Sequence, residues 1–421
     1  MQGADQRADA EEHVAAWARS GAMALTGPAD GAGLGPPAPL VPRLRAVADL
    51  LTGRAAALGA ELAVDPLAVL TERAAVAGLR RRSPVSCGGG TRLLPTADGW
   101  LAVALPRPSD VELVPAWLGV EADPADPWST VEPVVAARPT VELVAQGRLL
   151  GLPLGPLPPE PPAPAPPPAP LAPLPVRAER LGEAAALRSL EGVLVADLSA
   201  LWAGPLCGAL LADAGATVVK VESTTRPDGA REGPAAFFDR LNAGKRSVAL
   251  DVTTERGRAQ LRALVATADV VISSSRPRAL TQLGVHPEQV IYAGRTRAWV
   301  SITGHGRTGD AADAVGFGDD AAVAGGLVVW DADRPHLCAD AVADPTSGLV
   351  AAAATLDALT VGGRWLLDVA LARTAAHLAG PTLPVPPATA AAEPALPADR
   401  GRAAPLGADT DEMLAALPVG P

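Results

Sequence analysis

The chain has 421 residues, of which 48% are hydrophobic and only 3% aromatic, and its formal net charge is -11 at pH 7. This length predicts two or three domains and a large core, which must be built from Ala, Val and Leu. The acidic balance argues against nucleic acid as the main partner, because phosphate binding needs a basic face, but it allows a small anionic ligand in a local basic pocket.

The cysteines and the N-terminus indicate the compartment. Cys87, Cys207 and Cys338 lie far apart without CxxC spacing, so neither a metal site nor a disulfide framework is expected, and a reducing cytoplasm fits. The acidic start, MQGADQRADAEEHVAAW, lacks the features of a signal peptide. No uncharged apolar run reaches the roughly 18 to 20 residues that span a membrane. We expect a soluble cytoplasmic protein with no membrane contact.

The N-terminal part predicts a helical arm and then a small domain. Residues 43–82 are rich in Ala and Arg and indicate helices within an arm over residues 1–83. In 91–105, TRLLPTADGWLAVAL predicts a hairpin that turns at Asp98-Gly99. SDVELVPAWLG and TVELVAQGRLLG then predict short helices. We therefore expect a small α+β domain over 84–152.

A proline-rich linker follows over 153–177. Its core, PLGPLPPEPPAPAPPPAPLAPLP, favours extended polyproline II and is best read as a spacer. A second stretch rich in Pro and Ala, 381–405, opens a C-terminal segment over 381–421.

Between these segments, apolar strands alternate with helices, which predicts βαβ units and a parallel sheet. The expected strands are 193–199, 217–223, 247–253, 269–274 and 298–303, and the clearest helices are 204–215 and 254–268. The fold class is thus α/β: a Rossmann-like parallel-sheet domain over 178–303, continued by a helical part over 304–380, plus the small α+β domain. GxGxxG is missing after the first strand, so NAD is not indicated. Ligands of such sheets bind beyond the carboxyl ends of the strands.

Lysine is rare, and its two positions lie close together. The chain has 35 basic residues, but only Lys220, in TVVKVES, and Lys245, in LNAGKRSVALD, are lysines. Codon bias toward arginine explains the scarcity, but not why both lysines occur in one region.

Four segments together resemble the class III CoA-transferase family, which includes formyl-CoA transferase, carnitine CoA-transferases and α-methylacyl-CoA racemase. They are LEGVLVADLSALWAGPLCGALLADAGATVVKVES, FFDRLNAGKRSVALDVTTERGRAQLRALVATADVVI, RALTQLGVHPEQV with WVSITGHGRTGD, and the tail APLGADTDEML. The order of the segments is rearranged. SGAMALTGPADGAGLGPPAPL (20–40) resembles a segment that normally follows the Rossmann part, and residues 325–353 resemble the same segment again.

The resemblance implies a nucleophilic aspartate, which attacks an acyl-CoA thioester. Asp344, in ADAVADPTSGLVAAA, matches it, and Asp340 is the nearby competitor. The alternative reading of Asp344, which is followed by Pro345, is a plain helix N-cap. In the earlier copy of the segment the matching place falls near Arg43, so that copy lacks the nucleophile.

The resemblance also implies a CoA pocket, with acyl-CoA as substrate, no permanently bound cofactor and no metal. Its residues would be Leu201, Trp202, Lys220, Asn242, Lys245, Arg246 and Ser274. For Lys245 with Arg246 the alternative is a plain surface role. For Lys220 the alternative is a structural ion pair with Glu222 or another carboxylate.

The implied function is transfer of CoA between an acyl-CoA and a carboxylic acid, through aspartyl-anhydride and aspartyl-CoA intermediates. A homodimer, interlocked as in the family, or a pairing with a related subunit is implied as well. Two alternatives stay open. Departures such as Trp202 beside AGP and SSSRPRAL at 273–280 favour a degenerate acyl-CoA-binding or partner-dependent subunit. A racemase-like isomerase is disfavoured by Phe317, which stands where that branch has a histidine, although His305 lies in a nearby Gly-rich loop.

Overall fold

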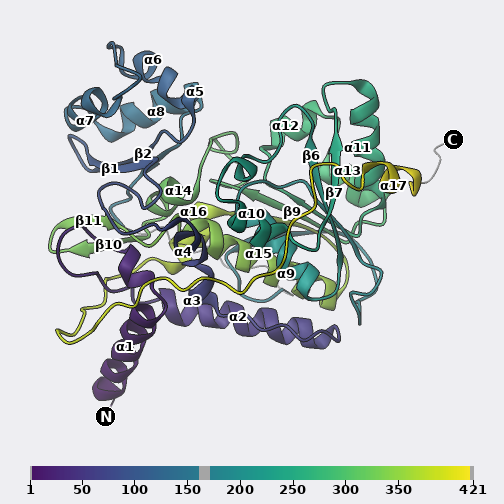
Figure 1. The fold of residues 1–421 in the computed structure, drawn as a ribbon, viewed down its shortest axis with the longest axis horizontal. Coiled ribbons are helices and arrows are strands. Elements are labelled where there is room, and N and C mark those ends of the chain that lie inside the picture. The colour runs from purple at the N-terminus through teal and green to yellow at the C-terminus, as the bar shows by residue number, and fades with distance from the viewer. Residues whose placement is uncertain (1, 161–170, 418–421) are drawn as a thin grey trace.

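A computed structural model describes residues 2–160 and 171–417 of the chain, and its centre is a largely parallel seven-stranded sheet (Figure 1). The strands lie in the order β4-β12-β9-β8-β5-β6-β7, and only β4 runs antiparallel to its neighbour. In chain order they are β4 (Val176–Gly182), β5 (Leu194–Asp197), β6 (Thr217–Ser223), β7 (Arg246–Leu250), β8 (Val270–Ser273), β9 (Ala298–Thr303) and β12 (Arg364–Ala370). The predicted α/β class and parallel sheet are confirmed, although one central strand, β12, comes from beyond residue 303.

The strand order reverses next to β5. From β5 the chain adds β6 and β7 on one side, then crosses back to place β8 on the other side. The crevice beyond the carboxyl ends of β5 and β8 is therefore the switch point, where ligands of such sheets bind. The helices of this half are α9 (Ala203–Asp213), α10 (Ala235–Asn242), α11 (Glu255–Thr267), α12 (Pro277–Gln282) and α13 (Pro287–Ala293), with a 3-10 turn η2 at Gly229–Glu232.

Helices cover both faces of the sheet because successive strand residues point to opposite sides. Val270 packs into the core beneath α9 and α15 (Ala343–Val361), whereas Val271 packs against α11 and α13. Helix α15 is apolar on nearly all sides and is buried between the sheet and α2 (Leu40–Ala57). A helix of this composition needs cover all round, and the N-terminal arm supplies it.

The arm and the small domain complete the molecule (Figure 1). The arm comprises α1 (Gln2–Arg19), η1 (Ala22–Leu25), α2, α3 (Pro66–Val69) and α4 (Glu72–Ala77). The small domain comprises β1 (Thr91–Pro95), β2 (Trp100–Ala104), β3 (Leu154–Pro156), α5 (Pro108–Glu112), α6 (Val114–Leu118), α7 (Trp128–Ala136) and α8 (Thr140–Leu150). The predicted hairpin is confirmed, since Pro95 pairs with Trp100 across the turn. The remaining elements are α14 (Gly318–Ala324), the hairpin β10 (Val328–Asp331) and β11 (Arg334–Leu337), α16 (Leu371–Leu378) and α17 (Thr410–Ala415).

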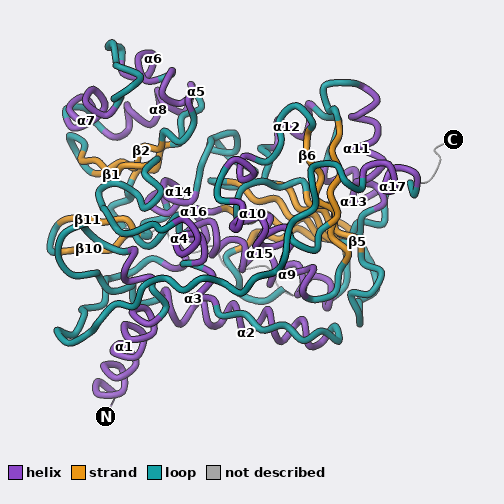
Figure 2. The backbone as a smooth tube through the Cα atoms, viewed as in Figure 1, coloured by secondary structure: helices purple, strands orange, loops and turns teal. Residues whose placement is uncertain are grey.

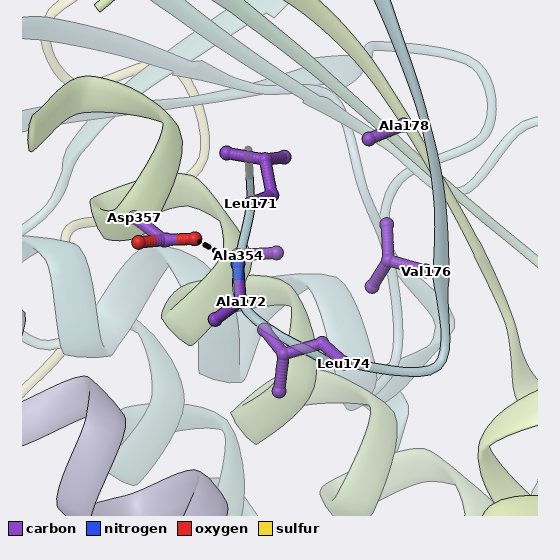
Figure 3. A pocket seen from close by; sticks show the side chains of 7 residues that line it. All are labelled: Leu171, Ala172, Leu174, Val176, Ala178, Ala354 and Asp357. Atoms are coloured by element: carbon purple, nitrogen blue, oxygen red, sulfur yellow. Dashed lines mark hydrogen bonds between the residues drawn. The ribbon is translucent and has the colours of Figure 1, made fainter. Parts of the chain in front are cut away.

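Asp357 of α15, which Figure 3 shows beside Ala172, joins segments that are distant in sequence. Residues 161–170 of the predicted linker lie outside the described residues. Just after them, the backbone N–H of Ala172 donates to Asp357 Oδ2 at 2.7 Å. Arg54 of α2 forms an ion pair with Asp357 Oδ1, also at 2.7 Å. A small apolar cavity beside these contacts is lined by Leu171, Ala172, Leu174, Val176, Ala178, Ala354 and Asp357.

The second Pro/Ala-rich stretch is an extended loop bound along the surface (Figure 2). Ala392 donates its backbone N–H to Ala18 of α1, and Arg400 pairs with Asp213 at the end of α9. It leads to α17, which lies against the edge strand β7. There Asp409 exchanges two hydrogen bonds with the Ser247 backbone, at 2.9 and 2.7 Å. The opposite edge strand, β4, presents charged side chains such as Arg177 and Glu179.

Helices long and apolar enough to cross a membrane do not occur within the described ranges.

Candidate active site

A turn at the carboxyl end of β5 forms one wall of the candidate site. The backbone N–H of Ala200 donates to Ser274 Oγ at 3.0 Å, which joins the ends of β5 and β8 at the switch point. Leu201 adopts a left-handed conformation, with φ 70°, and its N–H donates to Asp228 Oδ1 at 2.9 Å. A non-glycine residue held there stores strain, a feature that clusters at functional sites. The Leu201 side chain is 40% exposed. Of the predicted CoA residues, Leu201 and Ser274 therefore lie close together at the carboxyl ends of β5 and β8.

The Trp202 side chain is buried beneath this turn and does not line an exposed surface. It is 3% exposed and its ring meets Phe237 edge-to-face, with the ring centroids 5.0 Å apart. The guanidinium of Arg73, from helix α4 of the arm, lies over the same ring at 5.3 Å. The large residue beside AGP is thus packed between α10 and the arm.

The ammonium group of Lys245 is buried and bound entirely by protein atoms. It donates to Asp197 Oδ2 at 2.9 Å, to the Pro205 carbonyl at 2.8 Å and to Asn242 Oδ1 at 3.1 Å. All three ammonium protons are used, and Asn242 is itself buried. Burial alone would raise the pKa of Asp197, but the nearby ammonium groups of Lys245 and Lys220 hold it below its ordinary value.

Lys220 is buried in the same way on the other side of the turn. Its ammonium donates to the Ser199 carbonyl at 3.0 Å and to Asp228 Oδ2 at 2.8 Å. Asp228 in turn binds the N–H of Leu201. Lys220 therefore fixes the start of the turn and Lys245 fixes its end at Pro205. A surface role for Lys245 does not fit, and the ion-pair alternative for Lys220 does, with Asp228 as the partner instead of Glu222. Both lysines therefore stabilise the turn after β5 through buried hydrogen bonds, without reaching its surface.

Of the three predicted cationic residues, Arg246 is the one that stays accessible. Its side chain is 41% exposed, and its Nη1 lies 2.5 Å from Glu412 Oε1 of the C-terminal helix α17. An anion at this edge would have to compete with that carboxylate.

Asp344 enters the site from the first turn of α15. Four residues later on the same face, Gly348 packs against the Ala203 carbonyl, where an added Cβ would lie at 2.8 Å. Helix α15 therefore crosses the start of α9 at this point. Asp344 consequently lies near the turn that follows β5 and contains Leu201, which we call the Leu201 turn. The Asp344 carboxylate lies against Gly318 of α14, where an added Cβ would lie 2.6 Å from its Oδ2, and the residue as a whole is only partly buried.

Carboxyl groups crowd around Asp344. Burial, together with the charges of Asp319 and Asp340, raises the pKa of Asp344 to about 7, although Arg73 acts in the opposite direction. Burial, with Asp340 next in importance, likewise raises the pKa of Asp319 to about 6. Asp320 is fully buried, and burial raises its pKa well above the ordinary value. Carboxyls with shifted pKa values cluster at functional sites, which makes this group a candidate for one.

The competitor, Asp340, has a different role. Its carboxylate is fully buried and forms a bidentate pair with Arg73, at 2.7 and 2.5 Å. The residues on either side, Ala339 and Ala341, have φ values of 52° and 44°, so the loop before α15 is strained. Thr26 of the arm binds the Ala339 N–H at 3.0 Å, which holds the loop in place. Asp340 is therefore held in an ion pair, whereas Asp344 has no such pair within the part of the chain that the structure describes.

Sequence reasoning missed Arg73 and Asp319. Arg73 lies about 270 residues before Asp344 in a segment rich in Ala and Arg, so no local pattern singles it out. Asp319 and Asp320 form an acidic pair at a helix start, which is common on protein surfaces.

His305 and Phe317 lie near Asp320, next to the group of carboxyls around Asp344. Burial lowers the pKa of His305 to about 4, so its imidazole is neutral, and its Nε2 has no hydrogen-bond partner among the residues that the structure describes. The ring of Phe317 lies under the guanidinium of Arg107 at 5.5 Å. A side chain that transfers protons is therefore absent at position 317, as the sequence indicates.

Comparison with known proteins identifies the family. The model of the family described as CoA-transferase family III matches residues 190–408. Succinyl-CoA--D-citramalate CoA-transferase of Chloroflexus aurantiacus is 34% identical over 157 residues, which cover 35% of this chain and 39% of that protein. Succinate--glutarate CoA-transferase of Agrobacterium fabrum is 38% identical over 141 residues, covering 30% and 35%.

Human alpha-methylacyl-CoA racemase also matches, with 35% identity over 121 residues that cover 29% of this chain and 30% of that protein. Among solved structures, a hypothetical protein of Mycobacterium tuberculosis is 31% identical, with a TM-score of 0.41 and coverage of 44% of this chain and 56% of that one. The chain thus spans less than half the length of the curated relatives named here. Because the family model matches more than half of the sequence, the chain belongs to CoA-transferase family III.

Proposed function

We propose that the protein transfers CoA between an acyl-CoA and a carboxylic acid, with Asp344 as the nucleophile. The observation that carries this proposal is the position of Asp344: the residue is partly exposed, it lies one helical turn before the point where α15 crosses the start of α9, and it has no ion-pair partner within the described residues, whereas Asp340 is held by Arg73. An N-cap role alone does not fit, because Asp344 lies inside the first turn of α15 and the N-cap residue is Val342.

The proposed chemistry has four balanced steps. The Asp344 carboxylate attacks the thioester carbonyl, which forms an aspartyl-acyl anhydride and releases CoA thiolate. The thiolate attacks the aspartyl carbonyl, which gives aspartyl-CoA and releases the first carboxylate. The acceptor carboxylate attacks aspartyl-CoA, and this forms a second anhydride and frees the thiolate again. The thiolate then attacks the acceptor carbonyl, and the new acyl-CoA leaves behind a free Asp344. Only the ionised form of Asp344 can start the cycle.

The transferase is favoured over the isomerase alternative. An isomerase must move a proton at the substrate carbon, which needs a placed acid or base. Phe317 occupies the position of the expected histidine and is packed against Arg107. CoA would bind along the Leu201–Ser274 crevice with Trp202 below it, while Arg246 contacts a phosphate. Lys220, Asn242 and Lys245 would support that surface from inside.

A CoA-exchange assay tests the proposal. The protein is mixed with a panel of acyl-CoAs and carboxylic acids, beside Asp344→Asn, and new acyl-CoA products are measured by mass spectrometry. Products from the wild type only would support the transferase and identify its substrates. No products from the wild type, with CoA still raising the melting temperature, would point to the acyl-CoA-binding or partner-dependent alternative.

A further inference from the structure

The N-terminal arm contributes a charged residue to a site that lies otherwise in the family-matched region. Arg73, on helix α4, is outside residues 190–408. Its Nε donates to Asp340 Oδ2 at 2.7 Å and its Nη2 donates to Asp340 Oδ1 at 2.5 Å. This planar, two-point pairing is the strongest geometry available to an Arg–carboxylate pair.

Other contacts fix the guanidinium in this position. It lies over the Trp202 ring at 5.3 Å, which places it between the aspartates and the Leu201 turn. On its other side is Gly88, where an added Cβ would lie only 3.2 Å from Arg73 Nη2. The arm also supports the Asp340 loop directly through Thr26, whose hydroxyl binds the Ala339 N–H. Arg73 is therefore held by specific contacts on several sides, unlike a surface arginine that lies near the aspartates by chance.

The groups facing Arg73 are mostly acidic. Helix α14 contributes Asp319, the loop contributes Asp340 and helix α15 contributes Asp344. Just after the arm, the buried thiol of Cys87 also faces this loop, with its Sγ 3.5 Å from the Ala339 carbonyl. Arg82 lies near Cys87, and Arg107 is engaged by Asp110. Arg73 is the cation that acts on both Asp319 and Asp344.

We propose that Arg73 is a positioning residue: by neutralising Asp340, it allows Asp344 to lose its proton and act as a nucleophile near neutral pH. This inference rests on the proposed function for its catalytic part. Its electrostatic part concerns Asp344 alone and can be measured without turnover.

The physical reason is competition between carboxylates. Without the guanidinium, the Asp340 carboxylate would be buried beside Asp344 with no counter-charge. Two carboxyls that share a poorly solvated site do not both ionise readily, so one of them keeps a proton. Because Asp344 would also lose the direct attraction of Arg73, which lowers its pKa, it would stay protonated to a higher pH and the fraction of active nucleophile would fall.

The competing explanation is that Arg73 only attaches the arm to the large domain, and the chain offers a matched control. The neighbouring residue on α4, Glu72, forms its own bidentate pair with Arg240 of α10, at 3.0 and 2.8 Å. The two arginine side chains are similarly exposed, at 29% for Arg73 and 23% for Arg240. Arg240→Met therefore removes an equivalent arm contact and leaves the aspartate group untouched.

The experiment compares Arg73→Met, Arg73→Lys and Arg240→Met in the full chain, each alone and each combined with Asp344→Asn. Urea unfolding across pH 5 to 9 gives the free energy of unfolding of each variant with Asp344 and with Asn at that position. The difference between these two values depends on pH only through the ionisation of Asp344, so it reports the pKa of this group. The CoA-exchange rate of the variants that retain Asp344 is followed over the same range. We expect Arg73→Met to move the midpoint of both profiles upward by at least about one pH unit. Arg73→Lys should restore part of the shift, and Arg240→Met should lower stability with no shift.

Equal behaviour of Arg73→Met and Arg240→Met would overturn the inference. If Arg73→Met does not fold, the double variant Arg73→Met/Asp340→Asn removes both charges together, and its midpoint should return toward the wild-type value; a midpoint that stays high would contradict the proposal. If the wild type shows no exchange but its stability profile still shifts with Arg73, the proposed function fails while the electrostatic role of Arg73 stands.

Discussion

Gly318 leaves no room for a side chain beside Asp344: a Cβ built on Gly318 would lie 2.6 Å from Asp344 Oδ2 and 2.4 Å from the Ala341 carbonyl. Gly318→Ala should therefore displace the carboxylate or the loop before it. We expect destabilisation of about 1–3 kcal/mol from overpacking. Because a small misplacement of a reacting group is costly, CoA exchange should fall by about tenfold or more. Urea unfolding and the exchange assay measure the two effects.

Gly53→Ala is the control for this prediction. Gly53 lies in helix α2, and nothing lies within 4 Å of its would-be Cβ. Alanine should stabilise that helix by about 0.5–1 kcal/mol and leave exchange unchanged. Full activity in Gly318→Ala would show that the Gly318–Asp344 contact does not position the nucleophile.

The pKa of Asp344 predicts how activity depends on pH. Only the carboxylate attacks, and its pKa in the folded protein is about 7. The kcat/KM for CoA exchange should therefore rise with pH up to about 7 and then level off. A flat profile between pH 5 and 8, measured with a substrate pair that does not titrate in this range, would contradict the assignment.

The same group predicts a pH-dependent gain in stability for Asp344→Asn. The folded protein binds the Asp344 proton up to about pH 7, whereas the unfolded chain releases it near 3.8. The unfolded state therefore holds fewer protons in this window, and the free energy of unfolding of the wild type falls as pH rises. Asparagine does not titrate. The free energy of unfolding of Asp344→Asn should therefore exceed that of the wild type by an amount that is absent below about pH 4, grows up to about pH 7 and stays constant above. This difference should reach roughly 1.4 kcal/mol for each unit by which the folded and unfolded pKa values differ. Urea unfolding of both proteins at several pH values tests this sign.

Lys245 predicts a large loss of stability on substitution. Lys245→Met leaves the buried Asp197 carboxylate without its main counter-charge, which typically costs about 3–5 kcal/mol. The double variant Lys245→Met/Asp197→Leu removes both charges and should recover much of the stability. Equal destabilisation by the single and double variants would mean that packing, and not charge, dominates at this position.

Substitution of Arg246 tests whether this side chain binds CoA or only forms a surface ion pair with Glu412. If Arg246 binds a CoA phosphate, Arg246→Ala should raise the KM for acyl-CoA severalfold and weaken its dependence on salt, while stability changes by less than about 1 kcal/mol. Glu412→Gln breaks the same ion pair and keeps the cation, so it serves as the control. Its KM should not rise. A KM unchanged in both variants would place the phosphates elsewhere.

Much of the sheet can be predicted from the sequence because its signals are local. The residues of β6 and β9, 217–223 and 298–303, coincide with the expected runs, and the turn at Asp98-Gly99 joins β1 to β2. Strand β12 was not expected. Its run, RWLLDVA, is short and leads directly into α16, so only its pairing with β9 and β4 shows it to be a strand.

The candidate site is harder to predict because its charges come from distant segments. Lys220 and Lys245 stand out by their rarity, but only the structure shows that their ammonium groups point into the protein and hold Ser199 and Pro205. The pair of Arg73 with Asp340 joins residues 267 positions apart. Periodicity and spacing carry no information about such contacts, since they depend on how the arm packs on the sheet.

The two edges of the central sheet differ in how they avoid unwanted strand pairing. Strand β4 carries its own charged side chains, whereas β7 relies on Asp409 and Thr410 of the tail to occupy the N–H groups of Ser247 and Ala249. The tail is therefore also a solubility element. A version of the chain cut before residue 405 would keep every residue of the proposed catalytic group but expose a template for strand addition. Expression tags and truncations intended to improve crystals are best placed away from this end of the protein.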